Sequence, residues 1–347
     1  MRSLLRTLLI LTSCLCIVST HLYAQALGVM TGSVTDPSGA AVPRARITAT
    51  ETGTGFERSI ATDDTGHYTL PSLRPTDYSL TVEATGFAKY IQRNVRLIAD
   101  QTATIDVQLK VGSTAETMTV SAIAADAPLV DAATPTLTEV VGNTRIEELP
   151  LNGRAVAQLI ALVPGSAGAS PTVVAAQSSL PGSVQPSING ARNAQTGYLL
   201  DGAPFLDQYY NTNIPFPFPD SLQEFSVQTS TYSARYGGNA GAVVNVVTKS
   251  GTNSLHGNLF GFNRNQAYNA ANAFSGAVDP LHRTDFGGTL GGPVYIPWLY
   301  NGRDHTFFFF GYQGTRQRKP HSISATYPPS PSSKATSPPS AARLPIP

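Results

Sequence analysis

The chain has 347 residues, and its 23 Lys and Arg residues almost balance its 22 Asp and Glu residues. Only 13% of the residues are charged, against about 25% in an average soluble domain, which argues against a strongly basic nucleic-acid-binding protein and against an acidic disordered tail. The length allows about two to three domains, and the 41% of hydrophobic residues can form their cores. The 30 glycines and 26 prolines, with stretches rich in Thr, Val and Tyr between them, predict a mainly β protein.

Residues 1–26 have the composition of a secretory signal peptide. Arg2 and Arg6 precede an apolar run at residues 8–18, and Ala-Gln-Ala at 24–26 offers a cleavage site between small residues. We therefore expect export by the general secretory route. The alternative is a transmembrane anchor, which needs about twenty apolar residues.

Both cysteines of the chain, Cys14 and Cys16, lie in this leader. Residues 11–14 resemble a lipoprotein signal, which is a second alternative, but apolar chain instead of a polar tether follows Cys14. The mature chain has no cysteine, so neither a disulfide nor thiolate chemistry is available to it.

Residues 27–111 alternate short strand patterns with turn signals. Turns are expected at 36–39 (Asp-Pro-Ser-Gly) and 63–66 (Asp-Asp-Thr-Gly). At residues 102–111 Ala, Ile, Val and Leu alternate with polar residues, which is the pattern of a half-buried strand. About seven strands in this stretch predict an immunoglobulin-like or prealbumin-like β-sandwich.

The same stretch carries separated motifs in order, among them Gly-Ser-Val-Thr-Asp at 32–36, Gly-His-Tyr at 66–68, Leu-Arg-Pro at 73–75 and Ala-Thr-Gly-Phe at 84–87. Together they resemble the carboxypeptidase regulatory-like domain. The resemblance implies a sandwich of the kind that precedes many outer-membrane proteins and is grouped with carbohydrate-binding-like folds, without peptidase activity. We expect glycines at turns and aromatic residues in the core: Gly39, Gly66 and Gly86, and Tyr68, Tyr78 and Phe87.

Residues 112–135 form a connector rich in Ala, Thr and Asp, and part of it resembles the TonB box of outer-membrane active transporters. An extended segment of β-branched and small residues can add a strand to the edge of a partner's sheet. The resemblance implies a TonB-type energy-transducing protein as that partner. The alternative is a connecting strand without a partner. The candidate partner-binding residues are Glu116, Thr117, Met118, Thr119, Val120, Ser121 and Ala122.

Residues 136–251 predict a mixed α/β domain. Short helix patterns at 144–149 and 155–163 each end at a proline. Strand-like segments follow at 187–190, 197–202, 225–228 and 241–249.

Five motifs follow each other in this domain: Leu-Pro-Leu-Asn-Gly-Arg at 149–154, Asn-Gly-Ala-Arg at 189–192, Leu-Asp-Gly at 200–202, Ala-Arg-Tyr-Gly-Gly at 234–238 and Val-Val-Thr-Lys-Ser-Gly-Thr-Asn at 246–253. Together they resemble the plug domain of Oar-like TonB-dependent receptors. The resemblance implies a plug that sits inside a β-barrel and blocks its lumen. An aromatic loop set among prolines either contacts a ligand or packs onto the plug; its residues are Tyr209, Tyr210, Phe216 and Phe218.

Residues 252–318 resemble the opening barrel strands of the same receptors. At 254–264 the side chains alternate, and we expect His256, Asn258, Phe260, Phe262 and Arg264 to share one side. Two further strands are expected at 285–293 and 306–314, and the aromatic run at 307–312 suits a lipid boundary. The resemblance implies the cell outer membrane, with the N-terminal domain facing the periplasm.

A barrel that holds a plug has about 22 strands of roughly 9 to 11 residues, so three strands are an incomplete start of a transmembrane β-barrel. Residues 319–347 are rich in Pro and Ser, which predicts disorder. We therefore interpret the chain as a truncated N-terminal portion of a receptor.

Catalytic, cofactor and metal signals are weak, and the sequence predicts no enzyme and no bound cofactor. No Gly-x-Ser-x-Gly motif occurs, and the glycine-rich string at 287–292 is not followed by the Lys of a phosphate loop. The histidines of the mature chain have no metal-ligand spacing; they are His67, His256, His282, His305 and His321.

Three functions stay open at this point. The first is a TonB-dependent outer-membrane receptor or transporter, with an oligosaccharide or a peptide as the candidate ligand and no role for nucleic acid. The second is an envelope carbohydrate- or protein-binding module without transport. The third is a non-functional fragment of such a receptor.

Overall fold

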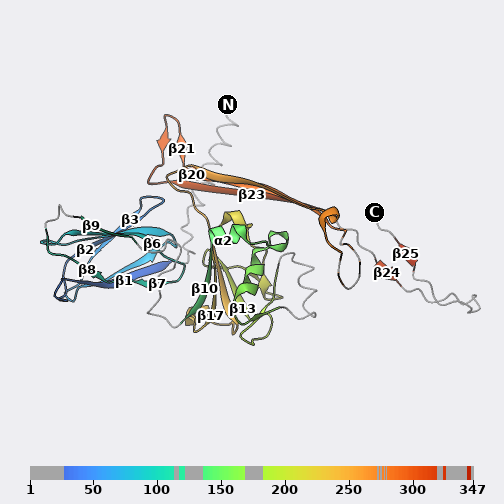
Figure 1. Ribbon diagram of the computed structural model, residues 1–347, viewed down its shortest axis with the longest axis horizontal. Coiled ribbons are helices and arrows are strands. Elements are labelled where there is room, and N and C mark those ends of the chain that lie inside the picture. The colour runs from blue at the N-terminus through green and yellow to red at the C-terminus, as the bar shows by residue number, and fades with distance from the viewer. Residues whose placement is uncertain are drawn as a thin grey trace, which may run out of the picture.

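The chain folds into three parts that follow each other in sequence (Figure 1). In the computed structural model the described residues are 27–112, 117–121, 136–168, 183–271, 273, 276, 278, 280–318, 323–325 and 342–344. The predicted signal peptide and most of the predicted linker and tail lie outside them. No helix among the described residues is long and apolar enough to cross a membrane.

The first part is a β-sandwich, as the alternating pattern predicts. One sheet contains β4, β1 and β7 in that order, with β8 also paired to β1, and the other has the order β3-β2-β5-β6-β9. The strands are β1 (Gly28–Thr35), β2 (Arg46–Glu51), β3 (Glu57–Ala61), β4 (His67–Leu73), β5 (Asp77–Glu83), β6 (Lys89–Arg96), β7 (Thr102–Thr104), β8 (Val107–Gln108) and β9 (Thr117–Ser121).

The two sheets enclose one apolar core, in which Met30, Ile47, Tyr68, Tyr78 and Leu80 are almost fully buried. Each tyrosine hydroxyl has a partner, as buried phenols require: Tyr68 donates to the carbonyl of Ile105 at 2.8 Å and Tyr78 to that of Arg74 at 3.1 Å. The expected core aromatics are therefore confirmed, with Phe87 packed at the margin of the core.

The predicted turns form around aspartates that accept backbone N–H groups. Asp36 accepts from Ser38 at 2.8 Å and from Ala40 at 2.9 Å, and Asp63 accepts in the same way from Thr65 and His67. Such turns leave the following glycine in the left-handed region, and Gly39 has a φ of 87°.

The predicted strand at 102–111 is divided. The side chains of Ala103, Ile105, Val107 and Leu109 are buried as the alternation predicts, whereas Val111 is exposed. The ladder stops between β7 and β8. There the Asp106 carboxylate accepts hydrogen bonds from the backbone N–H and the hydroxyl of Ser33, at 2.8 and 2.7 Å. A side chain thus replaces the backbone partner at this point of the ladder.

The second part, here called the α/β unit (residues 136–251), has a five-stranded sheet of order β10-β17-β18-β13-β14. Its strands are β10 (Leu137–Gly142), β13 (Thr196–Leu200), β14 (Ala203–Pro204), β17 (Leu222–Ser230) and β18 (Ala242–Thr248). Short helices cover one face, with Ile146, Leu159, Ile160, Tyr198 and Phe225 buried between them and the sheet. The helices that contribute to this core are α2 (Asn143–Glu148) and η2 (Val156–Leu162). The other short helices of the unit are η1 (Asn152–Arg154), η4 (Pro219–Ser221) and η5 (Ala234–Tyr236), and the short strand pairs are β11 (Ser166–Ala167) with β12 (Ser187–Ile188) and β15 (Leu206–Asp207) with β16 (Thr212–Asn213).

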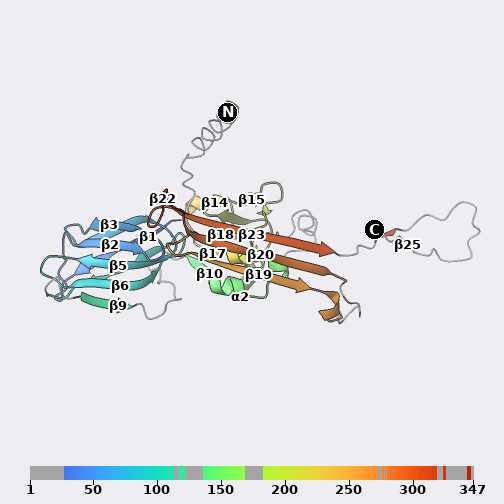
Figure 2. The same ribbon diagram turned by 90° about the horizontal axis from the view of Figure 1, so that it is seen from above.

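The third part is an antiparallel sheet, here called the wall sheet, of β19 (His256–Arg264), β20 (His282–Pro293) and β23 (Phe307–Arg318). Its long strands lie across the helical side of the α/β unit (Figures 1 and 2). Between β20 and β23 a small hairpin pairs β21 (Tyr295–Ile296) with β22 (Tyr300–Asn301), and η6 (Gln266–Tyr268) follows β19.

In the predicted disordered tail, β24 (Ile323–Ala325) pairs with β25 (Ala342–Leu344). Neither tripeptide contains proline, so each can donate to a ladder. For these six residues the structure differs from the prediction, and the rest of the tail lies outside the described residues.

We predict that Gly32→Ala destabilises the sandwich by about 2–3 kcal/mol, because an added Cβ would lie 1.9 Å from the Ile105 carbonyl oxygen. Gly39→Ala is the control: its φ is positive but no atom lies within 4 Å, so about 1 kcal/mol is expected. Urea-dependent hydrogen exchange of the β1 amides, followed by mass spectrometry, measures both. Equal losses in the two variants would contradict the close approach of β1 to Ile105.

Candidate functional site

The hexapeptide at 149–154, here called the NGR loop, is the part of the α/β unit that contacts the wall sheet. Its end is held in an unusual conformation, since Gly153 and Arg154 have φ values of 68° and 57°. This turn directs the Gly153 carbonyl at Arg283 of β20, which donates to it at 2.8 Å. A Cβ on Gly153 would lie 2.6 Å from the same guanidinium, which would have to move, and the positive φ itself favours glycine here.

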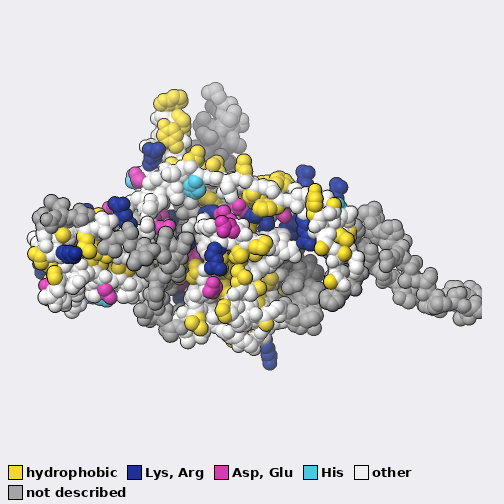
Figure 3. Space-filling view, in the orientation of Figure 1, with side chains coloured by type: hydrophobic (Ala, Val, Ile, Leu, Met, Phe, Trp, Pro, Cys, Tyr) yellow, Lys and Arg dark blue, Asp and Glu magenta, His cyan; other side chains and the backbone are white. Residues whose placement is uncertain are grey.

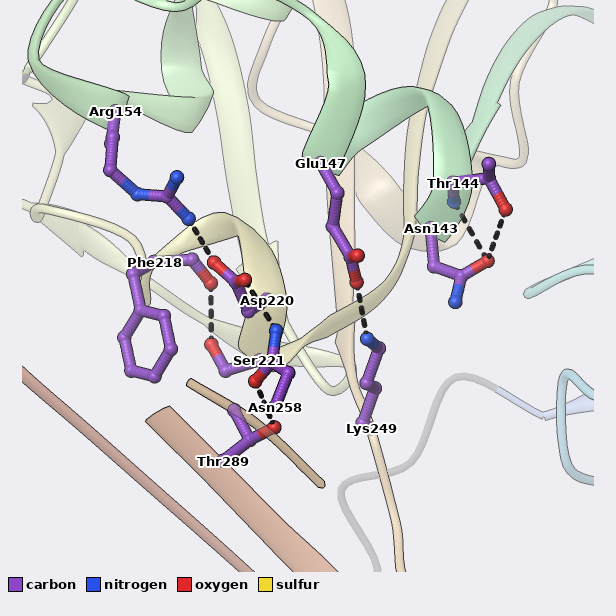
Figure 4. A network of polar contacts seen from close by, with 10 residues as sticks. All are labelled: Asn143, Thr144, Glu147, Arg154, Phe218, Asp220, Ser221, Lys249, Asn258 and Thr289. Atoms are coloured by element: carbon purple, nitrogen blue, oxygen red, sulfur yellow. Dashed lines mark hydrogen bonds and ion pairs between the residues drawn. The ribbon is translucent and has the colours of Figure 1, made fainter. Parts of the chain in front are cut away.

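Arg154 begins a polar chain that runs from the α/β unit into the wall sheet (Figure 4). Its guanidinium pairs with Asp220 of η4. The other carboxylate oxygen of Asp220 accepts from the Asn258 amide of β19 at 2.6 Å, and the Asn258 carbonyl oxygen accepts from the Thr289 hydroxyl of β20 at 2.6 Å. Four side chains from four elements are thereby joined.

Aromatic rings enclose this ion pair. The guanidinium carbon of Arg154 lies 4.5 Å from the ring centroid of Phe260 and 4.4 Å from that of Phe262, within cation–π range. The Arg154 and Asp220 side chains are only 10% and 8% exposed. Burial lowers the pKa of Arg154 and the Asp220 charge opposes this, but a guanidinium stays protonated in proteins.

Further contacts follow the same face of the wall sheet. Arg264 donates to the Asn152 side chain at 2.8 Å. Asp285 pairs with Arg283 at 2.8 Å and accepts from the Thr315 hydroxyl at 2.6 Å. The predicted alternation of β19 is therefore correct, because its polar side meets the α/β unit.

The opposite face of the wall sheet is apolar and exposed. Leu259 is 92% exposed, and Leu290, Phe310 and Tyr312 are also open to solvent. A sheet with one polar and one apolar face is typical of a membrane barrel strand, whose polar side lines the lumen.

A second junction links the sandwich to the wall sheet through Asn253. Its backbone N–H donates to the Gly53 carbonyl at 2.9 Å, and its side-chain amide donates to the Thr54 carbonyl at 2.8 Å. The same side chain exchanges hydrogen bonds with Asp304, which precedes β23, at 2.6 and 2.8 Å. One asparagine thus connects two parts of the chain.

A third junction joins the sandwich to the sheet of the α/β unit. Asp100 pairs with Arg235 and accepts from the Asn245 amide at 3.2 Å. Beside it, the Glu224 side chain is buried and accepts from the Ala99 backbone N–H at 3.3 Å. Burial raises the pKa of Glu224 to about 7, and the Asp100 charge acts in the same direction.

The candidate partner-binding segment is an edge strand of the sandwich. Thr117–Ser121 form β9, which pairs in parallel with β6 from Lys89↔Thr117 to Arg93↔Ser121. Met118 packs against the sandwich core. Glu116 and Ala122 lie outside the described residues.

In the expected aromatic loop, two of the residues pack as one of the two predictions has it, and contact with a ligand stays a prediction. Phe216 packs against Tyr198, Phe205 and Phe225, and Phe218 packs against Phe260 with centroids 5.5 Å apart. Tyr209 is exposed.

Sequence reasoning identified the NGR loop and the inward side of β19 but not Asp220, the acidic residue between them. No spacing rule connects Asp220 to Arg154, 66 residues before it, or to Asn258, 38 residues after it. In the part of the chain that the structure describes, no three His, Cys, Asp or Glu side chains are grouped to hold a metal ion.

Three domain families match the chain in succession. The Carboxypeptidase regulatory-like domain matches residues 29–110, the TonB-dependent Receptor Plug Domain matches 131–244, and the Outer membrane beta barrel domain matches 247–338. The resemblance and the fold class inferred from the sequence are thereby confirmed.

Among curated proteins, the chain is 27% identical over 287 residues to the TonB-dependent transporter Oar of Myxococcus xanthus. The match covers 79% of this chain and 25% of the relative, so the chain spans about a quarter of that relative's length.

Among solved structures, the siderophore receptor PirA from Acinetobacter baumannii shares 19% identity at a TM-score of 0.36, over 52% of this chain and 24% of that one. The 3-chlorocatechol 1,2-dioxygenase from Rhodococcus opacus 1CP shares 13% identity at a TM-score of 0.22, over 25% of this chain and 60% of that one.

We predict that Glu224 makes stability fall as pH rises. The pKa of Glu224 is about 7 in the folded chain and 4.5 ordinarily. Its contribution to the free energy of unfolding is therefore complete below pH 4.5 and is lost as pH rises through 7. The total loss is about 3 kcal/mol. Glu224→Gln should remove this loss and raise the thermal midpoint at pH 8 but not at pH 4.

Differential scanning calorimetry across this range measures the effect. Glu139→Gln, on the neighbouring strand β10, is the matched control and should keep the pH profile of the unaltered chain. A Glu224→Gln variant with that same profile would show that the carboxyl does not titrate at the junction.

Proposed function

We propose that the chain is the plug-bearing part of an energy-coupled outer-membrane receptor, because regulatory-like, plug and barrel domain families match it in succession. The α/β unit is then the plug and the wall sheet is the beginning of the barrel around it. The observation that supports this best is the polar chain from Arg154 to Thr289, because it gives the plug a specific seat on the lumen side of barrel strands.

The contact between the plug and the wall sheet is stable, but its hydrogen bonds can break together. Separating the plug from the wall leaves Asp220 without its Asn258 partner, and both Arg154 and Asp220 are buried at this contact. The Arg154–Asp220 ion pair lies within the plug and survives this separation, so the cost is the loss of a hydrogen bond to a charged group, about 1.5–3 kcal/mol. The plug therefore stays in place until an external force or a ligand offsets this cost.

We propose that the force acts on the segment Glu116–Ala122. Its strand β9 lies at the edge of the sandwich sheet, with β6 on one side and no other strand paired to it among the described residues. A free strand edge can accept a strand from a TonB-type protein through backbone hydrogen bonds.

The position of this segment in the chain would allow a force on it to be transmitted to the plug. Residues 122–136 connect β9 to β10, which is the edge strand of the plug sheet and pairs with β17. Tension on β9 would reach the plug through β10. The ligand would then pass the displaced plug, and an oligosaccharide or a peptide is our candidate for it.

Deleting residues 116–122 should weaken binding of the purified periplasmic domain of a TonB-type protein at least tenfold. The deletion removes β9, the edge strand with which a strand of the partner would pair. Fluorescence anisotropy with the labelled periplasmic domain measures this affinity. The matched control deletes the seven residues 123–129 of the same connector and should keep the original affinity.

Unchanged binding after loss of residues 116–122 would overturn the assignment of the handle. If the unaltered chain does not bind the TonB-type domain but does bind oligosaccharides on a glycan array, the sandwich as an envelope binding module accounts for the protein better.

A further inference from the structure

The hairpin between β20 and β23 exposes large apolar side chains that pack in neither core of the described residues. Its two strands, β21 and β22, are joined by a turn of Pro297, Trp298 and Leu299. The Trp298 side chain is fully exposed, and Tyr295 and Leu299 are mostly so. Soluble surfaces rarely leave such residues together in water.

The backbone of the turn is strained at Trp298, whose indole ring is exposed. Trp298 has a φ of 61°, a left-handed conformation that is a true outlier for a bulky residue. The fold accepts this strain although the Trp298 side chain is in no core. Strained residues cluster at functional sites, which makes Trp298 a candidate for a contact outside the chain.

The hairpin also has the composition of a membrane interface. From Val294 to Asn301 the chain has two tyrosines and a tryptophan but no charged residue, and Arg303 follows. Tyr and Trp favour the boundary between lipid headgroups and hydrocarbon, and a nearby cation is attracted to lipid phosphates.

The direction of the hairpin supports the same partner. It projects from the wall sheet on the side away from the plug (Figure 1) and ends in a cluster of hydrophobic side chains (Figure 3). This is the side to which Leu259, Leu290 and Phe310 are exposed. The hairpin therefore continues the apolar face that a barrel strand presents to lipid.

We propose that the hairpin is an interfacial foot that inserts Tyr295, Trp298 and Leu299 into the phospholipid leaflet on the periplasmic side of the outer membrane. The leaflet follows from the junction of Asn253 with Asp304, which places the sandwich at the hairpin end of the sheet. This inference rests on the proposed function, in which the sandwich faces the periplasm and the wall sheet contacts lipid.

The chain contains a built-in probe for this contact, because Trp298 is its only tryptophan. The whole chain is reconstituted in vesicles of phosphatidylethanolamine and phosphatidylglycerol, with and without bromine on the acyl chains near the headgroup. We expect emission shifted to shorter wavelength and at least halved by the brominated lipid. Bromine near the bilayer centre should quench less.

Two variants separate this inference from the proposed function. Both carry Trp298→Phe; one adds Phe310→Trp on the exposed face of β23, and the other adds Tyr209→Trp on the plug. The first should be quenched by brominated lipid and the second should not.

Quenching at position 310 but not at 298 would overturn the foot and leave the barrel assignment intact. No quenching at either position would contradict the membrane placement itself. A blue-shifted Trp298 that brominated lipid does not quench would mean that protein covers the hairpin, which also overturns the proposal.

Discussion

The buried guanidinium of Arg154 is the constraint on which the arrangement of plug and wall depends. A charge in a site that is one-tenth exposed must be paired, and Asp220 supplies the pair. Asp220 in turn uses its second oxygen for Asn258 of the wall. The ion pair therefore holds Asp220 in position to accept from β19, and the rings of Phe260 and Phe262 on the same strand lie against the guanidinium of Arg154.

The remaining junctions connect the sandwich to both the wall sheet and the plug. Asn253 ties the sandwich to the wall sheet, and Asp100 and Glu224 tie it to the plug sheet. The sandwich thus contacts both the plug and the wall sheet, the two bodies that separate in the proposed mechanism. A force applied to its edge strand β9 would act on the plug and leave the wall held by lipid, provided the foot at Trp298 anchors it.

Local patterns in the sequence predicted much of this, and long-range pairing explains what they missed. Alternation along β19 correctly separated Asn258 and Phe260 from Leu259, because side chains in a strand face opposite sides whatever the strand packs against. Neither the break of the predicted strand at Asp106 nor the ion pair of Asp220 has such a signal, since each depends on a residue distant in sequence. The sequence predicted an extended segment, which the structure shows at residues 117–121, but it gave no signal that these residues would pair with β6.

A double-mutant cycle between Asp220 and Asn258 tests the central claim most directly, since it isolates the bond between plug and wall. Stabilities of Asp220→Ala, Asn258→Ala and the double variant are measured by urea unfolding in detergent micelles, with the exposed pair Glu83 and Lys89 as a reference cycle. The account predicts a coupling energy above about 1 kcal/mol for the first pair and below about 0.5 kcal/mol for the second. Additive losses at Asp220 and Asn258 would contradict it.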